Sequence, residues 1–440
     1  MATIEVRYKG TGIGALSFEA EDTAARFEYF SEFVDQGIPL APLTMPAEKQ
    51  RIYTFPGLNW DTFKGLPGML ADSLPDDFGN AVLNRWLAQQ TSRTAPLTPL
   101  ERLQYTGSRG MGALEYFPAQ RKSQFPVERD IHLETLTRLA QSVLDARKDF
   151  HQDVQFDDRA EDKEMMEALL AVGTSAGGAR PKAVLAFNDD FTEVRSGQGD
   201  VAVGFTHYLL KFDGVREREP SQQTFGDPLG YGVMEYVYYL MATAAKIEMM
   251  PCHLLNEGSR RHFVTQRFDR VGNNKKHVQT LTAIKHVNYQ GIGAFSYEEL
   301  FRVARELRLP RVDALNLFRR MVFNHVATNH DDHSKNFAFV LEGDEWRLAP
   351  AYDMAFSYKP GNPWVEQRWM SLNGKRIGHN RADFHALAEV HLPRVSKKEI
   401  DEIIEEVLEA VSKWGALAKE HEVPEGLNKV VQDNIRLNDF

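Results

Sequence analysis

The segment Asn329-His330-Asp331-Asp332-His333-Ser334-Lys335-Asn336 concentrates two carboxylates, two imidazoles, one ammonium group and two amides in eight consecutive positions. It directly follows a run of apolar residues with helical spacing that ends near Thr328. Asp331 and Asn336 have the D-x-x-x-x-N spacing of a protein-kinase catalytic loop, in which the aspartate accepts the proton of the acceptor hydroxyl and the asparagine binds a metal ion. The segment therefore predicts a site for phosphoryl transfer.

A hairpin is predicted directly after this segment. Residues 337–341 (FAFVL) have strand character, residues 342–345 (EGDE) form a turn, and residues 346–348 can run back along the first strand. This return would bring Asp353 close to Asn336. Carboxylate and amide oxygens are ligands that Mg²⁺ prefers, so we predict that Asn336 and Asp353 hold a metal ion on the phosphates of a nucleotide.

Two other interpretations of the segment remain open. Asp, Asn and His residues after a helix commonly serve as caps and turns, which would make the segment purely structural. Alternatively, His325, His330 and His333, with Asp331 beside them, could bind a transition metal in a phosphohydrolase. That enzyme would need further histidine or carboxylate ligands in a helical domain.

The part of the chain before this segment contains features that suit a nucleotide. Residues 173–182 (GTSAGGARPK) could form a phosphate-binding loop, because glycine lets backbone N–H groups approach an anion closely. The loop is not a Walker A motif, since Ala179 stands where that motif requires lysine. Lys211 ends an apolar strand and could reach the phosphates. Residues 265–270 (TQRFDR) could supply backbone groups to an adenine ring.

A helix predicted over residues 229–245 contains a single charged residue, Glu235. The helix is too apolar to leave much of its surface exposed, and a buried carboxylate needs a partner. Lys211 is the expected partner, because kinases pair a strand lysine with a helix glutamate to position the phosphates. The alternative is that Glu235 emerges at the edge of its lobe.

Composition limits the classes of protein that remain. The 440 residues include 42% hydrophobic residues, enough for two or three folded domains. The 52 basic and 62 acidic residues give a net charge of −10, so no overall positive field attracts nucleic acid or an acidic membrane. One cysteine indicates a reducing compartment, and neither a signal sequence nor a membrane-spanning run is evident. We therefore expect a cytoplasmic protein.

The pattern along the chain predicts an α+β protein in three parts. Residues 1–120 form an N-terminal α/β cap, residues 121–270 form a small lobe with the glycine-rich loop and the strand lysine, and residues 271–440 form a mostly helical C-terminal lobe with the catalytic loop and the metal-binding aspartate.

Together these motifs resemble the HipA family of bacterial serine/threonine kinases, the toxins of toxin–antitoxin pairs. The motifs that carry the resemblance are residues 175–182 (SAGGARPK), 267–270 (RFDR), 329–336 (NHDDHSKN), 350–353 (PAYD), 63–75 (FKGLPGMLADSLP) and 107–114 (GSRGMGAL). The resemblance implies a two-lobed, protein-kinase-like fold with an N-terminal cap, and it implies that the protein uses ATP and Mg²⁺.

The resemblance also implies a role for each matching residue. Asp331 would be the catalytic base, helped by Lys211 and His333, and Asn336 and Asp353 would be the metal ligands. The implied nucleotide-binding residues come from the glycine-rich loop, the strand lysine, the end of the small lobe, the catalytic loop and the metal carboxylate: Gly177, Gly178, Ala179, Arg180, Pro181, Lys182, Lys211, Gln266, Arg267, Phe268, His333, Ser334, Lys335, Asn336, Tyr352 and Asp353.

Regulation and partners follow from the same resemblance. Ser175 matches the serine that family members autophosphorylate, and added negative charge would favour ejection of the glycine-rich loop from an anionic site. Family members phosphorylate proteins, aminoacyl-tRNA synthetases being the best-known targets, and so arrest growth and promote persistence. A HipB-like helix-turn-helix antitoxin would carry any DNA contact. A non-catalytic relative that acts as a co-repressor on such an antitoxin is the alternative.

Overall fold

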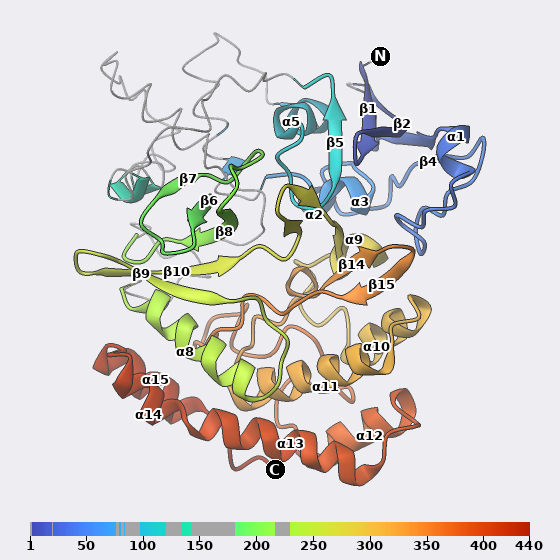
Figure 1. The fold of residues 1–440 in the computed structure, drawn as a ribbon. Coiled ribbons are helices and arrows are strands. Elements are labelled where there is room, and N and C mark those ends of the chain that lie inside the picture. Colours follow the sequence, from blue (N-terminus) through green and yellow to red (C-terminus); the bar gives the residue numbers. More distant parts are fainter. Residues whose placement is uncertain are drawn as a thin grey trace.

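The computed structural model describes residues 2–19, 21–75, 79–80, 83, 97–119, 134, 136–138, 140–141, 181–215 and 229–440. Figure 1 shows a cap and a small lobe lying above a helical lobe. The strands are β1 (Ala2–Tyr8), β2 (Thr11–Phe18), β3 (Arg26–Tyr29), β4 (Ile52–Tyr53), β5 (Leu114–Phe117), β6 (Lys182–Asn188), β7 (Val194–Ser196), β8 (Phe205–Lys211), β9 (Cys252–Glu257), β10 (Arg260–Gln266), β11 (Arg270–Val271), β12 (Asn274–Lys275), β13 (His277–Thr280), β14 (Ala338–Glu342) and β15 (Glu345–Leu348). The helices are α1 (Ser31–Val34), α2 (Trp60–Phe63), α3 (Gly68–Ala71), α5 (Pro99–Thr106), α8 (Tyr231–Ala244), α9 (Leu281–Lys285), α10 (Tyr297–Glu306), α11 (Arg311–Val326), α12 (Arg381–His391), α13 (Lys397–Ser412), α14 (Trp414–Glu420) and α15 (Glu425–Asn434), with a 3₁₀ turn, η2, over Ser334–Asn336.

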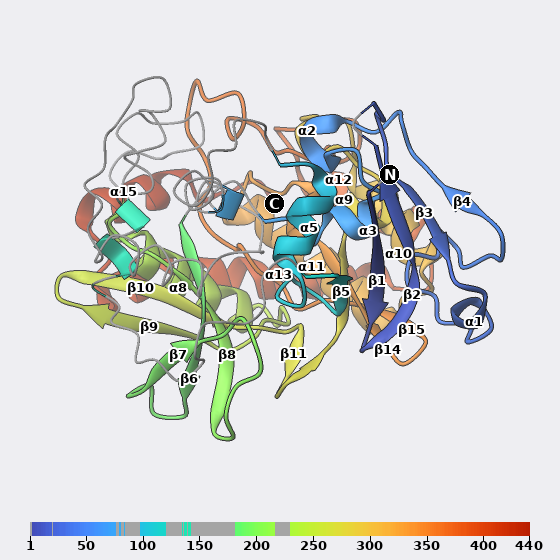
Figure 2. The same cartoon turned by 90° about the horizontal axis from the view of Figure 1, so that it is seen from above.

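The cap is built on an antiparallel sheet with the strand order β4-β3-β2-β1-β5. Along most of β1 and β2 buried side chains alternate with partly buried ones, as expected for a sheet with one face in the core and the other closer to water. Figure 2 shows this sheet at one side of the molecule and strands β6–β10 at the other. The predicted α/β cap is therefore present in the fold.

The small lobe is a second antiparallel sheet, ordered β7-β6-β8-β10-β9, with α8 packed against it. Strand β6 is buried along almost its whole length, and β8 carries Lys211 at its end. Strand β10 ends at Gln266. The chain leaves the sheet there because Arg267 and Asp269 turn into a buried ion pair.

Long amphipathic helices dominate the C-terminal lobe. Helix α13 buries one apolar stripe, formed by Ile400, Ile403, Ile404, Val407 and Val411, against α11 and α8. The predicted hairpin is present as β14 and β15, and it joins β13 in a three-stranded sheet that the sequence pattern did not indicate. One large hydrophobic cluster extends from the cap strands through α8 to these helices, and a smaller cluster forms around Val278, Ala338, Val340 and Ala349.

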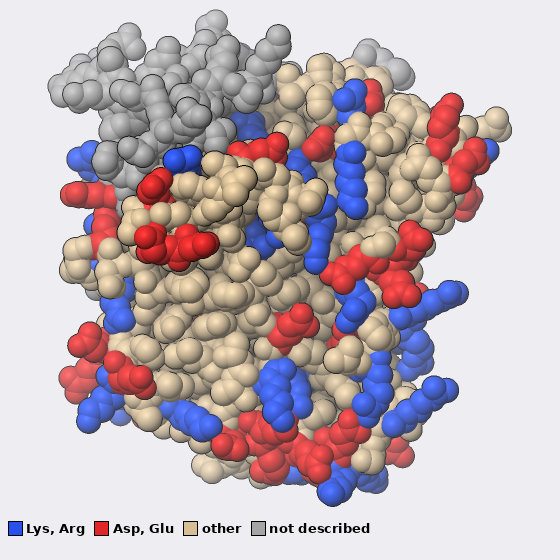
Figure 3. Space-filling model, in the orientation of Figure 1, with Lys and Arg blue, Asp and Glu red and all other residues tan. Residues whose placement is uncertain are grey.

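The described surface mixes both signs of charge. Figure 3 shows lysine, arginine, aspartate and glutamate side chains interspersed over the C-terminal helices. None of the helices in the described part of the chain combines the length and apolar character that crossing a bilayer requires.

Gly232 allows α8 to pack closely on the sheet. A Cβ at Gly232 would lie 2.0 Å from the carbonyl oxygen of Arg261, a backbone atom that cannot move aside easily. We expect Gly232→Ala to lower the free energy of unfolding by about 1–3 kcal/mol because the helix must shift away from β10. Denaturant unfolding followed by circular dichroism measures this loss.

Gly426→Ala is the matched control. Gly426 lies in exposed α15, where an added Cβ meets no atom within 4 Å. We expect this change to raise the free energy of unfolding by about 0.4–1 kcal/mol, since alanine restricts the unfolded chain. Equal effects of the two substitutions would contradict the close packing of α8.

Candidate active site

Lys211, at the end of β8, lies between two carboxylates from different parts of the fold. Its Nζ is 2.5 Å from Oε1 of Glu235 on α8 and also forms an ion pair with Oδ1 of Asp353, which follows the β14–β15 hairpin. Glu235 is 4% exposed, so the lone charge in the apolar helix is buried and paired. The lysine therefore links the small lobe to the C-terminal lobe.

A carboxylate fixes the start of α8 and hence the position of Glu235. Asp213, buried just after β8, accepts hydrogen bonds from the backbone N–H groups of Gly230 and Gly232, at 3.0 and 3.3 Å. Such a carboxylate satisfies N–H groups that the first turn of a helix leaves unpaired. Since Asp213 follows Lys211 by two residues, the same chain segment sets the position of both members of the ion pair.

Two lysines lie directly opposite each other in the small-lobe sheet. Lys182 on β6 is paired in register with Lys211 on β8, and Lys182 is buried. Like charges opposite each other on neighbouring strands are destabilising, so this pair needs anions nearby. Glu235 and Asp353 supply two negative charges in the protein, and the phosphates of a nucleotide would supply more.

The pKa values reflect this cluster of charges. Burial alone would raise the pKa of Asp353, but the positive charges of Lys211 and Lys182 outweigh it and lower the pKa to about 2. Burial would lower the pKa of Lys211, and the carboxylates of Asp353 and Glu235 instead raise it above its ordinary value. Lys211 and Asp353 are therefore both ionised near neutral pH.

The catalytic-loop segment begins where α11 ends. Tyr238 on α8 donates to the carbonyl of Ala327 at 2.6 Å, and Asn329 donates to the side chain of Asn324 at 3.0 Å, which fix the exit from the helix. Asn336 Nδ2 donates to the backbone oxygen of Asp331 at 2.7 Å and so closes the loop on itself. The loop is thereby held rigid between α11 and β14.

Asp331 and Asp332 are neighbours in sequence but lie in different surroundings. The Asp331 side chain is 35% exposed, whereas the Asp332 side chain is fully buried. Asp332 forms an ion pair with Arg368 at 3.2 Å and accepts hydrogen bonds from Tyr297 and the backbone of Trp369, both at 2.7 Å. Asp332 is therefore a structural anchor, and Asp331 is the carboxylate available to a reactant.

His333 faces Asp331 from within the same loop. Its Nδ1 accepts a hydrogen bond from the backbone N–H of Lys335 at 3.2 Å, so in the neutral ring the hydrogen is on Nε2. Nε2 lies 3.6 Å from Oδ1 of Asp331. The Tyr352 hydroxyl donates to the carbonyl of Lys335 at 2.6 Å, which ties the loop to the segment that carries Asp353.

The cap braces the catalytic loop from the other side. Asp72 accepts hydrogen bonds from the backbone N–H and the hydroxyl of Thr280, at 2.7 and 2.9 Å, and Thr280 caps the start of α9. Thr282 on α9 then hydrogen-bonds the hydroxyl of Ser334 at 2.7 Å. A chain of contacts thus runs from the cap to the loop.

The end of the small lobe forms a second link to the cap. The guanidinium of Arg267 pairs with both carboxylate oxygens of Asp269, at 2.9 and 2.7 Å, and Arg270 contacts Asp269 and the backbone of Gly110. Burial would raise the pKa of Asp269, but the two arginines lower it well below its usual range. Arg267 and Arg270, the first and last residues of the RFDR motif, thus stabilise the fold through Asp269.

The backbone of residues 266–268 has one N–H group that a ligand could use. The N–H groups of Gln266 and Arg267 are bonded to the carbonyls of Pro251 and His207. Within the described part of the chain, the N–H of Phe268 has no such partner. The Phe268 ring stacks on the ring of Tyr352, with 5.9 Å between the ring centroids. The backbone N–H of Phe268 is therefore available to a planar ligand such as adenine.

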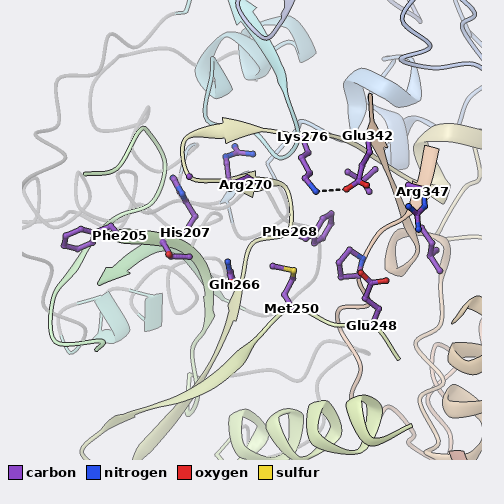
Figure 4. A pocket seen from close by; sticks show the side chains of 16 residues that line it. Phe205, His207, Glu248, Met250, Gln266, Phe268, Arg270, Lys276, Glu342 and Arg347 are labelled. Carbon is purple, nitrogen blue, oxygen red and sulfur yellow. Dashed lines mark hydrogen bonds and ion pairs between the residues drawn. The ribbon is translucent and has the colours of Figure 1, made fainter. Parts of the chain in front are cut away.

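A cavity of about 380 Å³ lies beside this segment. Figure 4 shows Gln266, Phe268 and Met250 around it, with the Lys276–Glu342 ion pair at one side. Its lining includes no residue of the Lys211 cluster or of the catalytic loop. The cavity is therefore separate from the phosphate end of the predicted site.

Two family models match the sequence. The HipA N-terminal domain matches residues 4–117, and the HipA-like C-terminal domain matches residues 174–414, more than half of the 440 residues. The chain belongs to the HipA family.

Among the sequence relatives of this HipA-family chain are two proteins named as kinases. "Putative kinase Y4mE" of Sinorhizobium fredii is 25% identical over 229 residues, which cover 48% of this chain and 51% of that protein. A "Putative kinase" of Haemophilus influenzae is 23% identical over 271 residues, which cover 53% of this chain and 73% of that protein. The match thus spans about half the length of the first relative.

A solved structure shares the fold. HipA of Shewanella oneidensis MR-1, in a complex with HipB and operator DNA, aligns with a TM-score of 0.66 at 15% sequence identity, over 99% of this chain and 95% of that chain. The predicted two-lobed, α+β, HipA-like fold is confirmed.

Several residues named from the sequence lie outside the described residues, namely Ser175, Gly177, Gly178, Ala179 and Arg180. The described residues bring together the other groups that the HipA resemblance implied for the phosphate end: Lys182, Lys211, Asp353 and the loop from Asp331 to Asn336. Pro181, next to Lys182, accepts a hydrogen bond from the N–H of Phe212 through its carbonyl, which closes the end of the β6–β8 pair.

The described residues contain no cluster of ligands for the transition metal that the phosphohydrolase hypothesis requires. Burial lowers the pKa of His325 and His330 to about 4 and 3. Each ring is used in the fold: His325 Nε2 lies 3.2 Å from Oδ2 of Asp439, and His330 Nδ1 hydrogen-bonds the carbonyl of Val365. No group of three or more His, Cys, Asp or Glu side chains suited to a metal occurs among these residues.

Sequence reasoning missed three residues that shape the site: Asp72, Asp332 and Trp364. Asp332 stands beside Asp331 in a polar run, and burial, which the pattern does not show, separates their roles. Asp72 acts through Thr280, which lies 208 positions away. Trp364 follows an Asn-Pro turn and donates its indole N–H to Asp331. The turn and the aromatic residue can be recognised in the sequence, but the contact of Trp364 with Asp331 cannot.

The buried ion pair of Asp332 leads to a stability prediction. Asp332→Asn leaves the Arg368 charge buried without its counterion, which should lower the free energy of unfolding by about 3–5 kcal/mol. Asp331→Asn, at the half-buried neighbour, should change it by less than about 0.5 kcal/mol. Thermal and urea unfolding of both variants measures the difference, and comparable losses would contradict the division of roles.

Asp72 leads to a prediction about pH. Burial raises the pKa of Asp72 to about 6, although hydrogen bonds from Thr280 and the charge of Lys335 oppose it. The unfolded chain releases this proton near pH 4, so between pH 4 and 6 the folded state binds more protons and its stability falls as pH rises. Asp72→Asn removes this contribution.

The measurement compares the unfolding of the wild type and Asp72→Asn from pH 3.5 to 7. The stability of the wild type relative to the variant should decline across pH 4–6 and stay level above that range. Asp61→Asn, at an exposed position of the cap, is the control and should show no such decline. A relative stability that rises with pH would refute the assignment.

Proposed function

We propose that this chain is an ATP- and Mg²⁺-dependent protein kinase that transfers phosphate to serine or threonine. The observation that supports this most directly is the meeting of Lys211, Glu235 and Asp353 at the junction of the lobes. Tyr352, the residue before Asp353, donates a hydrogen bond to the carbonyl of Lys335 in the loop that carries Asp331 and Asn336. Phosphoryl transfer needs charge neutralisation at the phosphates, metal ligands and an acceptor for the hydroxyl proton. In this proposal Lys211 neutralises phosphate charge, Asn336 and Asp353 are the metal ligands, and Asp331 accepts the proton.

Mg²⁺ fits the oxygen donors present. Because Asn336 commits Nδ2 to the backbone of Asp331, its Oδ1 points elsewhere, and among the described residues that oxygen accepts no hydrogen bond. Asp353 uses Oδ1 for Lys211 and keeps Oδ2. Mg²⁺ is commonly held by one or two protein oxygens together with substrate phosphates. Asn336 and Asp353 would thus hold the ion, which would offset phosphate charge during transfer.

The residues of the chain divide the remaining work. Lys211 and Lys182 would bind the phosphates, and Glu235 would keep Lys211 extended toward them. The N–H of Phe268 would receive the adenine ring, with Gln266 and Tyr352 beside it. Asp331 would accept the proton of the hydroxyl as the phosphoryl group reaches it, and His333 would hold the loop in order. The contacts of Lys211, Asp353 and Asn336 support this division of roles.

Partners are proposed from the relatives. The Shewanella HipA structure contains HipB and operator DNA, and we infer a HipB-like partner for this chain, with DNA contacted through that partner. The net charge of −10 agrees with DNA binding that is not direct. The substrate is inferred to be a protein, with an aminoacyl-tRNA synthetase as the first candidate to test. A purely non-catalytic co-repressor is the second candidate function.

A transfer assay separates the two functions. Purified protein is incubated with radiolabelled ATP, Mg²⁺ and cell lysate, and labelled proteins are resolved on a gel. Asp331→Asn and Asp353→Asn should each reduce labelling by roughly 10²–10⁴-fold, because one loses the base and the other a metal ligand. Asp344→Asn, in the exposed turn between β14 and β15, is the matched control and should label like the wild type. Identical labelling by all four proteins would reject the kinase.

Autophosphorylation of Ser175 gives a separate test. After incubation with ATP and Mg²⁺, mass spectrometry should find phosphate on Ser175 in the wild type and none in Asp331→Asn. Ser175→Ala should keep transferring phosphate to lysate proteins for longer, since loop ejection by the added charge of about −2 would be prevented. An active wild type with unmodified Ser175 would reject self-inactivation and leave the kinase assignment intact.

A further inference from the structure

Trp364 contacts the carboxylate that the proposed function makes the base. Its indole Nε1 donates to Oδ1 of Asp331 at 2.7 Å. The same oxygen faces Nε2 of His333 at 3.6 Å, beyond hydrogen-bond distance. The indole is therefore the side-chain donor that holds Asp331 within the described part of the protein, and Oδ2 is left for an acceptor hydroxyl.

The backbone around Trp364 is anchored on both sides. On one side, Asn362 accepts a hydrogen bond from the backbone N–H of Trp364 at 2.9 Å. On the other, the carbonyl of Val365 bonds His330 at 3.0 Å, and Asp332 accepts from the backbone of Trp369 at 2.7 Å. The strap, residues 361–370, is thus fixed to the catalytic loop by the two neighbours of Asp331.

The indole ring is held as firmly as its backbone. It meets the His333 ring edge-on at 6.0 Å and the Tyr289 ring at 6.4 Å, and Tyr289 in turn lies 5.6 Å from His333. Lys335 Nζ lies 4.3 Å from the centre of the Tyr289 ring. Aromatic rings packed edge to face restrict one another. The N–H of Trp364 therefore points at Asp331 without needing to reorganise.

We propose that Trp364 is a positioning residue that fixes the rotamer of Asp331, so that one carboxylate oxygen is bound by the protein and the other is presented to the acceptor hydroxyl. This inference depends on the proposed kinase function. An aspartate side chain that rotates freely spends less time in the reactive geometry, and misplacement by about 1 Å can cost 10²-fold in rate. The effect should appear in turnover and leave nucleotide binding unchanged.

The chain offers a matched control for this residue. Trp369 lies five positions further along the same strap and is fully buried, but its Nε1 has no hydrogen-bond partner within the described structure. Trp364→Phe and Trp369→Phe therefore make the same chemical change, and only the first removes a hydrogen bond to Asp331. The second should lower the melting temperature, because it opens a cavity in the core.

The kinetic experiment measures phosphate transfer from ATP to myelin basic protein, used as a general acceptor. Trp364→Phe should lower kcat by about 10-fold or more while the KM for ATP and the melting temperature stay at their wild-type values. Trp369→Phe should keep kcat within about twofold and lower the melting temperature. An unchanged kcat in Trp364→Phe, or a loss of kcat only in proportion to lost folded protein, overturns the proposal.

A spectroscopic test reports the hydrogen bond without any turnover. Protein labelled with ¹⁵N-tryptophan gives one indole signal for each of its six tryptophans, and the signal absent from Trp364→Phe belongs to Trp364. In Asp331→Asn that signal should move upfield, since the donor loses a charged acceptor, while the signal absent from Trp369→Phe should stay in place. A Trp364 signal that ignores Asp331→Asn overturns the proposal.

The two experiments separate this inference from the function on which it depends. A wild type that transfers no phosphate to any acceptor rejects the kinase and with it any catalytic positioning, even if the indole signal responds to Asp331→Asn. An active wild type whose rate is insensitive to Trp364→Phe rejects only the role of Trp364.

Discussion

Two lysines that face each other across neighbouring strands impose a constraint on the whole molecule. Lys182, which is buried, and Lys211, whose side chain is 12% exposed, cannot lie in register without anions close by. One anion, Glu235, comes from the helix behind the sheet, and the other, Asp353, comes from the C-terminal lobe. The lobes therefore meet at a point where positive charge in one is balanced by negative charge in the other. The metal-bound triphosphate of the proposed function would add charge of both signs at this point.

Neighbouring residues of the loop from Asp331 to Asn336 have different roles in the structure. Asp331 remains partly exposed, and its immediate neighbours, His330 and Asp332, are committed to the strap that follows the hairpin. A loop that carries a partly exposed and a fully buried carboxylate in adjacent positions cannot move one without disturbing the other. The same arrangement explains why so many polar groups are concentrated in eight residues: Asn329, His330, Asp332, Ser334 and Asn336 all form hydrogen bonds that hold the loop in place.

The sequence predicted the α+β fold and the pairing of Lys211 with Glu235, because both leave local patterns. The D-x-x-x-x-N spacing, the alternating strands of the hairpin and the single charge in an apolar helix are local signals, and the structure brings Lys211 and Glu235 together as expected. Contacts between distant segments leave no such pattern. Asp72 reaches Thr280, and Trp364 reaches Asp331, only through the packing of the cap and the strap. Strand β13 was missed because four residues next to a short helix carry too little periodicity to be distinguished from a loop.

The brace between cap and catalytic loop has a consequence for biosynthesis. Asp72 and Thr280 are 208 positions apart, and a ribosome adds roughly 5 to 20 residues per second, so the cap leaves the ribosome about 10 to 40 s before its docking surface on α9 exists. During that interval the nascent cap carries a carboxylate without its partner, and Gly68 lacks the Ala283 backbone and the His286 side chain that later pack against it. Each new molecule thus passes through a stage in which the surface of the cap that later contacts α9 is accessible to chaperones and proteases. That stage ends only when the chain has grown past Thr280.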